Sequence, residues 1–298
     1  MIEIRNVTKK FGAFTAIQNI TMKIEESSIY GIVGYNGAGK TTLLKVIAGM
    51  YKPDNGEVLI DGENVYDNGN LRSDMFFIAD EMFIPRGYNL ERLRKLYKGY
   101  YPNFNDNVYC RMVEAMGLDT KKNVYSFSKG MQRQAEIVIA MASMPKYLLL
   151  DECFDGIDPQ KRNLCKKIFV EYMAESGCSM IMSSHNIQEI GNLCDRVGLI
   201  NGKELSMDVG VDDISSAYVK YQMVLPNEVS ESDFDFVESK GIKIDGRIAS
   251  VIVSSNVGAD VFDVLKPVHI SSIALSLEDV LLNEMEDKEY DITKIFVK

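Results

Sequence analysis

Apolar and polar residues alternate along residues 2–7 and again along residues 16–24, as they do in strands with one buried face. Residues 29–33 form a continuous apolar run, which is typical of a strand buried on both faces. Over residues 41–50 the apolar positions recur at helical spacing instead. The glycine-rich residues 34–41 link the two, so the sequence predicts a strand, a tight loop and a helix in succession.

Strands and helices continue to alternate through the first two thirds of the chain. Residues 85–145 have mostly helical spacing, and two apolar strands follow at 147–150 and 179–182 with a helix between them. Strands separated by helices in this way favour a parallel sheet. We expect an α/β domain over residues 1–205, with a mixed sheet core and a helical subdomain at about 85–145.

The pattern changes after about residue 205 and predicts a second, small α+β domain over residues 206–298. Three short apolar segments have the character of strands, and three have helical spacing. The expected strands are residues 219–224, 247–253 and 268–275, and the expected helices are residues 233–239, 259–265 and 277–285.

Charge divides the chain at the same place. The sequence has 33 Lys and Arg against 43 Asp and Glu, a net charge of −10. Residues 205–298 hold 18 acids and 8 bases, whereas residues 1–204 hold 25 of each. Sequence-independent binding of nucleic acid needs a basic footprint, so this distribution argues against a nucleic-acid partner.

The sequence predicts a protein of the cytoplasm. Residues 1–5 lack the basic and apolar stretches of a secretory signal. No apolar run approaches the roughly 18 residues of a spanning helix. The five cysteines are odd in number and lack Cys-x-x-Cys spacing, so we expect reduced thiols without disulfides or zinc.

Residues 34–41 match the P-loop pattern for phosphate binding, with a strand before them and a helix after. Glycines let successive backbone N–H groups turn toward one anion, and the helix N-terminus adds its positive dipole. Lys40 is expected to reach the β- and γ-phosphates of a nucleotide, and Thr41 to bind Mg²⁺. The candidate nucleotide-binding residues here are Gly34, Tyr35, Asn36, Gly37, Ala38, Gly39, Lys40, Thr41 and Thr42.

Two carboxylates follow the apolar strand at 147–150. Given the P-loop upstream, Asp151 is expected to bind the hydration shell of Mg²⁺ as the Walker B acid. Glu152 is expected to polarise the attacking water as a general base. Without the P-loop, the two acids would be no more than the exposed end of a strand.

Residues 127–131, upstream of this strand, resemble the Leu-Ser-Gly-Gly-Gln signature of the ATP-binding-cassette (ABC) family. Ser128 and Gly130 match, and the other three positions differ. Ser128 stands at an expected helix N-terminus, where its hydroxyl and free N–H groups can meet a phosphate. Because the P-loop, the signature and the two carboxylates follow one another in this order and spacing, residues 2 to about 205 resemble one full cassette. The resemblance implies the fold of a P-loop NTPase, the activity of an ATPase, and ATP and Mg²⁺ as cofactors.

Other segments resemble the same family in the same order. Residues 154–159 are similar to its D-loop, His185 to its switch histidine and Phe11 to its aromatic A-loop. The resemblance implies that His185 contacts the γ-phosphate and holds the water of Glu152. It also implies that Phe11 stacks on adenine, a buried core position being the alternative for this ring.

One position departs from the family, which usually has a Mg²⁺-binding Gln between the P-loop and the signature. No Gln occurs between Gln18 and Gln132, and Asp80 takes that place. A carboxylate can still offer oxygen to Mg²⁺. However, it adds negative charge beside Asp151 and Glu152, so we expect altered hydrolysis rather than none.

The family sandwiches each ATP between the P-loop of one cassette and the signature of another. Only one P-loop occurs here, so the resemblance implies pairing with a second copy or a similar chain. The leading interpretation is the ATP-binding subunit of an export-type transporter, peripheral on the inner face of the cell membrane. It would drive a permease on a separate chain.

The permease is expected to dock on residues 80–101, which are rich in aromatic residues and Arg. Residues 276–282 resemble a segment common at the C-termini of bacterial export-type cassettes. Ordinary helical packing is the alternative explanation of the docking set. That set is Phe83, Arg86, Tyr88, Arg92, Arg94, Tyr97, Tyr100 and Tyr101.

Two other functions stay open. One is a soluble cassette that acts on ribosomes or DNA, which the single cassette, the lack of sustained heptads and the acidic second domain disfavour. The other is a nucleotide-binding regulator without turnover, suggested by Asp80 and the altered signature. Against it, Lys40, Asp151, Glu152 and His185 are all present.

Overall fold

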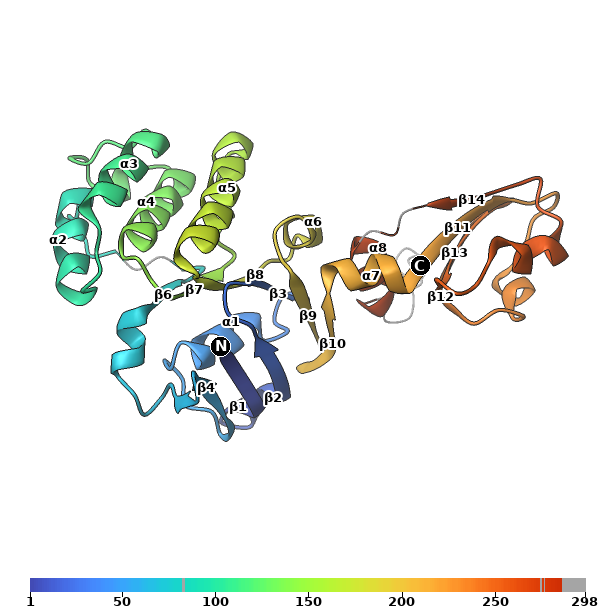
Figure 1. The fold of residues 1–298 in the computed structure, drawn as a ribbon, viewed down its shortest axis with the longest axis horizontal. Helices are drawn as coiled ribbons and strands as arrows, with labels where there is room; N and C mark the ends of the chain where they lie inside the picture. Colours follow the sequence, from blue (N-terminus) through green and yellow to red (C-terminus); the bar gives the residue numbers. More distant parts are fainter. Residues whose placement is uncertain (82–83, 274, 276, 286–298) are drawn as a thin grey trace, which may run out of the picture. The chain divides into compact units, whose positions relative to one another are not determined.

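The computed structural model describes residues 1–81, 84–273, 275 and 277–285 (Figure 1). The chain forms two compact units, which divide between Asp208 and Val209. The first unit holds the glycine-rich loop and both candidate carboxylates, and the second has a sheet and a core of its own.

The first unit begins with an antiparallel sheet in the order β2-β1-β4-β5. Ile2 and Ile4 pair with Ile24 and Met22 of the next strand, and all four are buried. Alternate residues of a strand point to one face. The predicted strands with one buried face are confirmed here. The strands are β1 (Ile2–Phe11), β2 (Phe14–Ile24), β4 (Asn55–Ile60) and β5 (Glu63–Asn64).

The second sheet has six strands in the order β10-β9-β3-β8-β7-β6. β3 pairs in parallel with β8 and β9, and β7 pairs in parallel with β6 and β8. Because the carboxyl ends of parallel strands meet at one edge, the residues that follow β3, β7 and β8 come together there. The strands are β3 (Ile29–Val33), β6 (Met75–Ile78), β7 (Tyr147–Asp151), β8 (Ser179–Ser183), β9 (Arg196–Asn201) and β10 (Glu204–Gly210).

Helix α1 (Lys40–Ile47) packs between these two sheets (Figure 1). Leu43, Leu44 and Ile47 are fully buried in a core that both sheets share. Burial of one whole helix face fixes where the helix starts, and therefore where the loop after β3 ends.

One short 3₁₀ helix precedes β6, and the helices that follow β6 include the predicted helical subdomain. Asn89, Asn105 and Ser128 each cap the helix after them by accepting a hydrogen bond from a backbone N–H. None of the helices in the described residues combines the length and apolar composition that crossing a membrane requires. The helices are η1 (Asn70–Asp74), α2 (Leu90–Tyr100), α3 (Asp106–Met116), η2 (Val124–Ser126), α4 (Lys129–Ala142), α5 (Pro159–Ser176) and α6 (Ile187–Gly191).

The second unit contains a four-stranded antiparallel sheet in the order β12-β13-β11-β14. Met223, Val251, Phe234 and Phe262 form the centre of its core. Its elements are α7 (Val211–Ala217), β11 (Tyr218–Val224), η3 (Glu231–Phe234), β12 (Ser239–Asp245), β13 (Ile248–Ser254), η4 (Ala259–Leu265), β14 (His269–Ile273) and α8 (Leu277–Met285).

The helix predicted over residues 233–239 is wrong. A short 3₁₀ helix ends at Phe234, and a strand that the sequence did not predict, β12, begins at Ser239. Ile242 and Ile244 alternate with polar residues and pair with Val251 and Ala249 of β13. The predicted helix shares only Ser239 with β12, whose conformation depends on pairing with β13.

Candidate functional site

The glycine-rich loop between β3 and α1 needs its glycines for two different reasons. Gly37 and Gly39 have φ angles of 82° and 108°, a region that side chains rarely adopt. A Cβ on Gly39 would also collide with Ile17, and one on Gly34 would lie 2.6 Å from the carbonyl oxygen of Ile200. The loop therefore lies in close contact with both sheets, and the chain continues from it into the N-terminus of α1.

Lys40 is folded back over this loop. Its side chain is 7% exposed. Nζ donates hydrogen bonds to the carbonyl of Gly34 at 2.8 Å and to that of Tyr35 at 3.3 Å. It also lies 3.8 Å from Oε1 of Glu152. The ammonium is therefore held at the centre of the loop, where it can neutralise a bound phosphate.

Asp151 ends β7 and is fully buried. Its Oδ1 accepts a hydrogen bond from the hydroxyl of Ser183 at 2.6 Å. Its Oδ2 is buried and has no hydrogen-bond partner among the described residues. A buried carboxylate oxygen of this kind is costly unless a ligand completes it. Oxygen donors are what Mg²⁺ prefers, so Asp151 fits the expected metal.

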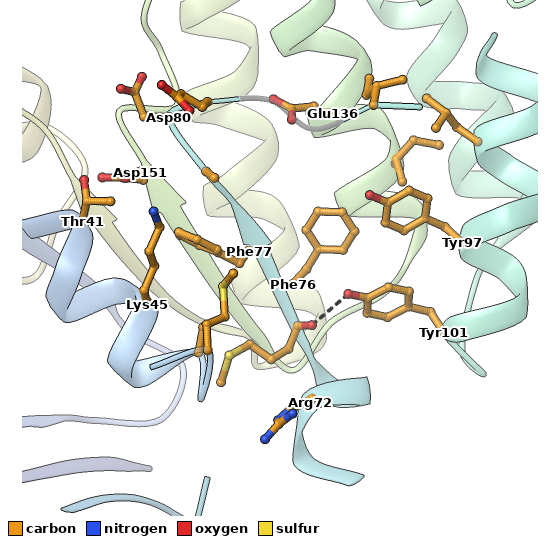
Figure 2. Close-up of a pocket in the computed structure, with 18 residues that line it drawn as sticks. Thr41, Lys45, Arg72, Phe76, Phe77, Asp80, Tyr97, Tyr101, Glu136 and Asp151 are labelled. Carbon is orange, nitrogen blue, oxygen red and sulfur yellow. Dashed lines mark hydrogen bonds between the residues drawn. The ribbon is translucent and has the colours of Figure 1, made fainter. Parts of the chain in front are cut away.

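Asp151 opens into a cavity of about 720 Å³. Figure 2 shows Thr41, Lys45, Asp80 and Asp151 on one side of this cavity, and Tyr97 and Tyr101 on the other. The ammonium of Lys45 points toward Thr41 and Asp151. All three predicted metal ligands, Thr41, Asp80 and Asp151, thus line the same cavity.

Glu152 and His185 contact one another directly. Oε2 of Glu152 lies 2.9 Å from Nδ1 of His185 and accepts a hydrogen bond from the His185 backbone N–H at 3.3 Å. Glu152 has a φ of 48°, a left-handed conformation that is uncommon outside glycine. A carboxylate oxygen of Asp155 lies within 4.8 Å of a carboxylate oxygen of Glu152 and of a ring nitrogen of His185. Carboxylate and imidazole are therefore paired at the edge where β7 and β8 end.

The signature residues occupy the start of α4. The hydroxyl of Ser128 accepts a hydrogen bond from the N–H of Met131 at 3.3 Å, as an N-cap does. A Cβ on Gly130 would collide with the carbonyl oxygen of Gly156, so α4 and the loop after β7 touch through backbone. Neither Ser128 nor Gly130 lines the cavity that holds Asp151.

Phe11 lies at the end of β1 and is 45% exposed. Its ring meets the edge of Tyr51 at 5.4 Å between centroids, and Nζ of Lys9 lies 5.5 Å from its centre. The alternative of a buried core position does not hold. The ring is partly exposed, and it does not line the cavity of Asp151.

Asp80 follows β6, and its side chain is 53% exposed. Arg133 of α4 donates to the carbonyl oxygens of Ala79 and Asp80 and to the carboxylate of Glu136. Burial raises the pKa of Glu136 to about 7, against the opposing charge and hydrogen bond of Arg133. Sequence reasoning missed this cluster, because α4 presents as an apolar helix with a few polar positions.

The predicted docking set divides into inward and outward members. Tyr97 and Tyr101 line the cavity and pack on Phe76, with centroids 5.5 and 5.3 Å apart. Arg94 is paired with Asp106 at 2.9 Å, whereas Tyr100 is 70% exposed. Ordinary packing thus accounts for part of the set. Phe83 of the docking set and the first residue of the 276–282 segment lie outside the described residues.

The sequence matches a known family and its members. The profile of the ABC transporter family matches residues 17–155. The methionine import ATP-binding protein MetN 1 of Listeria monocytogenes serovar 1/2a is 30% identical, with 79% of this chain and 73% of that protein covered. The uncharacterized ABC transporter ATP-binding protein YcbN of Bacillus subtilis (strain 168) is 28% identical, with 100% of this chain and 96% of that protein covered.

Solved structures share the fold. A dimeric, post-hydrolysis structure of the ATP-binding cassette MJ0796 bound to ADP and Pi has a TM-score of 0.64 at 22% identity. The match covers 71% of this chain and 99% of that one. This similarity confirms the predicted P-loop NTPase fold with mixed sheets and a helical subdomain.

Proposed function

Because this chain belongs to the ABC transporter family, we propose that it is the ATP-binding and ATP-hydrolysing subunit that drives a separate membrane permease. One observation carries the proposal. A phosphate loop with a centred Lys40, a buried Asp151 oxygen without a partner and a Glu152–His185 pair meet at one sheet edge.

Nucleotide binding rests on the loop between β3 and α1. The backbone N–H groups of residues 34–41, the N-terminus of α1 and the ammonium of Lys40 bind the phosphates. Thr42 adds a hydroxyl at the start of α1, and Phe11 stacks on the adenine through its exposed face.

The donors around the cavity fit Mg²⁺. The hydroxyl of Thr41 and the carboxylates of Asp151 and Asp80 would hold it. When bound, the ion would neutralise charge on the β- and γ-phosphates. Ser183 keeps the other oxygen of Asp151 occupied, so that Oδ2 alone is presented.

Hydrolysis needs a positioned water and little covalent help from the protein. Glu152 accepts a proton from the water as its oxygen bonds to the γ-phosphorus, and ADP leaves with the electrons of the broken P–O bond. His185 keeps Glu152 in place through its ring and its backbone N–H. Lys40 stabilises the charge that develops on the phosphate oxygens.

We propose that two cassettes pair, so that Ser128 and Gly130 of one subunit meet the nucleotide of the other. Ser128 and Gly130 lie outside the cavity of their own chain, which supports a role toward a partner. The dimeric MJ0796 cassette is a related arrangement in another protein. The partner is a second copy or a similar chain.

The permease is the membrane-spanning partner in this proposal, and the cassette is peripheral on the inner face of the membrane. The cavity wall formed by Tyr97 and Tyr101, with Tyr100 exposed beside it, supports a docking site for a segment of the permease. Export is the direction that we propose. The second unit, residues 209–298, would stabilise the dimer or regulate coupling.

Affinity capture from gently solubilised membranes tests the proposal. The bait is the tagged chain with Glu152→Gln and MgATP, which favours the closed dimer, and Lys40→Ala serves as the nucleotide-free control. We expect a stoichiometric multi-spanning protein to be recovered with the bait. Recovery of soluble partners only, with ribosomes or DNA among them, would contradict the transporter assignment.

A further inference from the structure

Arg133 is a buried arginine of α4 that bonds to the segment after β6. Its side chain is 5% exposed. Nη1 donates to the carbonyl of Ala79 at 2.6 Å, and Nη2 donates to the carbonyl of Asp80 at 2.8 Å. Nη1 also donates to Oε2 of Glu136, one turn along the helix, at 2.8 Å. One guanidinium thus joins the helix that begins after Ser128 to the backbone that carries Asp80.

The same guanidinium faces the charge of Asp80. Nη2 lies 3.8 Å from Oδ1 of Asp80. In the described part of the chain, no other Lys or Arg is recorded within 4.0 Å of that carboxylate. Asp80 shares a cavity wall with Asp151, so its negative charge would otherwise repel a second carboxylate in the same site.

A buried arginine is stable only when its charge and its donors are matched. Arg133 donates to the carboxyl group of Glu136 in the same helix and to the two carbonyls, so three of its five N–H donors are matched by these groups. The planar fork of an arginine suits such a set, whereas the single ammonium of a lysine does not. The arrangement is therefore specific for the shape of arginine and not only for its charge.

We propose that Arg133 is a positioning residue for Asp80, which it holds against α4 at the edge of the nucleotide site. It does so by fixing the backbone of residues 79–80 and by offsetting the Asp80 carboxylate. The inference rests on the proposed function, because it assigns a role within the same site. It follows that α4, whose first turn carries the signature residues, cannot shift without moving Asp80.

The test is Arg133→Lys, which keeps the charge and removes the fork. We expect kcat for ATP hydrolysis to fall about tenfold, because a displaced group near the reacting atoms costs rate even when binding persists. KM for ATP should stay close to that of the wild type. The Mg²⁺ concentration that half-saturates binding of a fluorescent ATP analogue should rise severalfold.

Arg196→Lys is the matched control. Arg196 also bonds to a carboxylate and a carbonyl, Oδ1 and the main-chain oxygen of Asp208, at 2.6 and 3.0 Å. It lies on β9 and does not line the cavity of Asp80. Arg196→Lys should leave kcat and the Mg²⁺ dependence unchanged. A fall in kcat in this control would show that replacing any hydrogen-bonded arginine by lysine slows hydrolysis.

A double-mutant cycle keeps the test decisive if Arg133→Lys is less stable. Asp80→Ala removes the side-chain oxygen that would bind Mg²⁺ and should therefore slow hydrolysis by itself. If Arg133 acts through Asp80, adding Arg133→Lys to Asp80→Ala should cost no further rate. Costs that multiply, or an Arg133→Lys protein with the rate and Mg²⁺ dependence of the wild type, would overturn the inference. A wild-type protein that does not hydrolyse ATP would instead overturn the proposed function itself.

Discussion

Glu152 is held in place by its backbone as well as by its partner. The left-handed φ of 48° turns its side chain away from the course of β7, and such a conformation persists only where the surroundings enforce it. The backbone N–H of Glu152 donates to the hydroxyl of Ser183, and the carboxylate of Glu152 accepts from the backbone N–H of His185 and contacts its ring. These bonds supply that enforcement. Replacement by Gln keeps the shape and removes the base, which makes Glu152→Gln the informative change at this position.

At the scale of single residues, Asp80→Gln tests whether the extra carboxylate tunes the reaction. Removal of a half-exposed negative charge beside Asp151 should raise kcat about threefold, the effect of a screened interaction of about 0.7 kcal/mol. The same change should weaken the dependence on Mg²⁺. Steady-state hydrolysis across a Mg²⁺ titration measures both, and no change in either would contradict the assigned role.

Residues that belong to a short sequence motif could be predicted from the sequence. Residues that join the site only because distant segments fold together could not. The strand, loop and helix around Lys40 are local, and the structure has them in the predicted order. Ser183 of β8 donates a hydrogen bond to Asp151, and Lys45 lines the cavity from α1. Neither residue has a spacing that distinguishes it from ordinary polar positions.

At the scale of elements, α4 links three parts of the site. Ser128 caps its N-terminus and Gly130 lies in its first turn. Arg133 bonds to the segment of Asp80, and the buried face of the helix packs in the core. An element with so many fixed contacts transmits a shift at one end to the other.

Glu136→Gln tests how the buried carboxyl group of Glu136 changes the free energy of unfolding with pH. In the folded protein the pKa of Glu136 is raised to about 7 from an ordinary 4.5, so the folded state holds the proton more tightly. Stability therefore falls as pH rises through this window. Arg133 is hydrogen-bonded to Glu136, and the cavity that Glu136 lines also holds other charged or titratable groups, namely Lys45, Arg72, Asp80, Glu81, Tyr97, Tyr101 and Asp151.

Urea unfolding at pH 5.5 and pH 8 measures that cost. Between these values the wild type should lose about 2 kcal/mol of unfolding free energy relative to Glu136→Gln, because Gln has no proton to release. Glu114→Gln, at an exposed position of α3, is the control and should show no such difference. An equal response of wild type and Glu136→Gln would contradict the buried, proton-holding carboxyl.

Gly130→Ala tests the close contact between α4 and the loop after β7. The added methyl group would meet the carbonyl oxygen of Gly156, which is backbone and cannot turn away. We expect a loss of about 1–3 kcal/mol in unfolding free energy. Gly99→Ala in α2 meets nothing within 4 Å and should be neutral or stabilising. Equal effects of the two substitutions would show that the contact is not rigid.

Elements were predictable where periodicity was strong and not where pairing decides the outcome. Within the predicted helical spacing of residues 85–145, residues 129–142 form α4, and the alternation of residues 2–7 lies within β1. β12 contains Gly241 and only two alternating isoleucines, so its strand identity comes from β13. A single sequence contains no signal for such a partner.

At the scale of the whole molecule, the two units have separate cores. The core around Leu43 and Leu149 belongs to the first unit, and the core around Met223 and Phe262 belongs to the second. Asp208, at the end of the first unit, is tied to Tyr30 at 2.9 Å and to Arg196 at 2.6 Å. These hydrogen bonds therefore anchor the last residue of the first unit to β3 and β9.

A chain that ends after Gly210 keeps β10 and the Asp208 contacts, and tests what the second unit adds. Because the first core is intact, the shortened chain should fold cooperatively and bind ATP with the affinity of the full chain. Its MgATP-dependent dimer should be weaker, as shown by sedimentation over a range of concentrations. Unchanged dimerisation would contradict a stabilising role of residues 211–298.

The central claim is that MgATP closes two of these cassettes on each other and that Glu152 then opens them by hydrolysis. Light scattering on the Glu152→Gln protein, with and without MgATP, tests it most directly. The claim predicts a monomer without nucleotide and a dimer with it, and no dimer for Lys40→Ala under the same conditions. A Glu152→Gln protein that binds ATP and remains a monomer would contradict it.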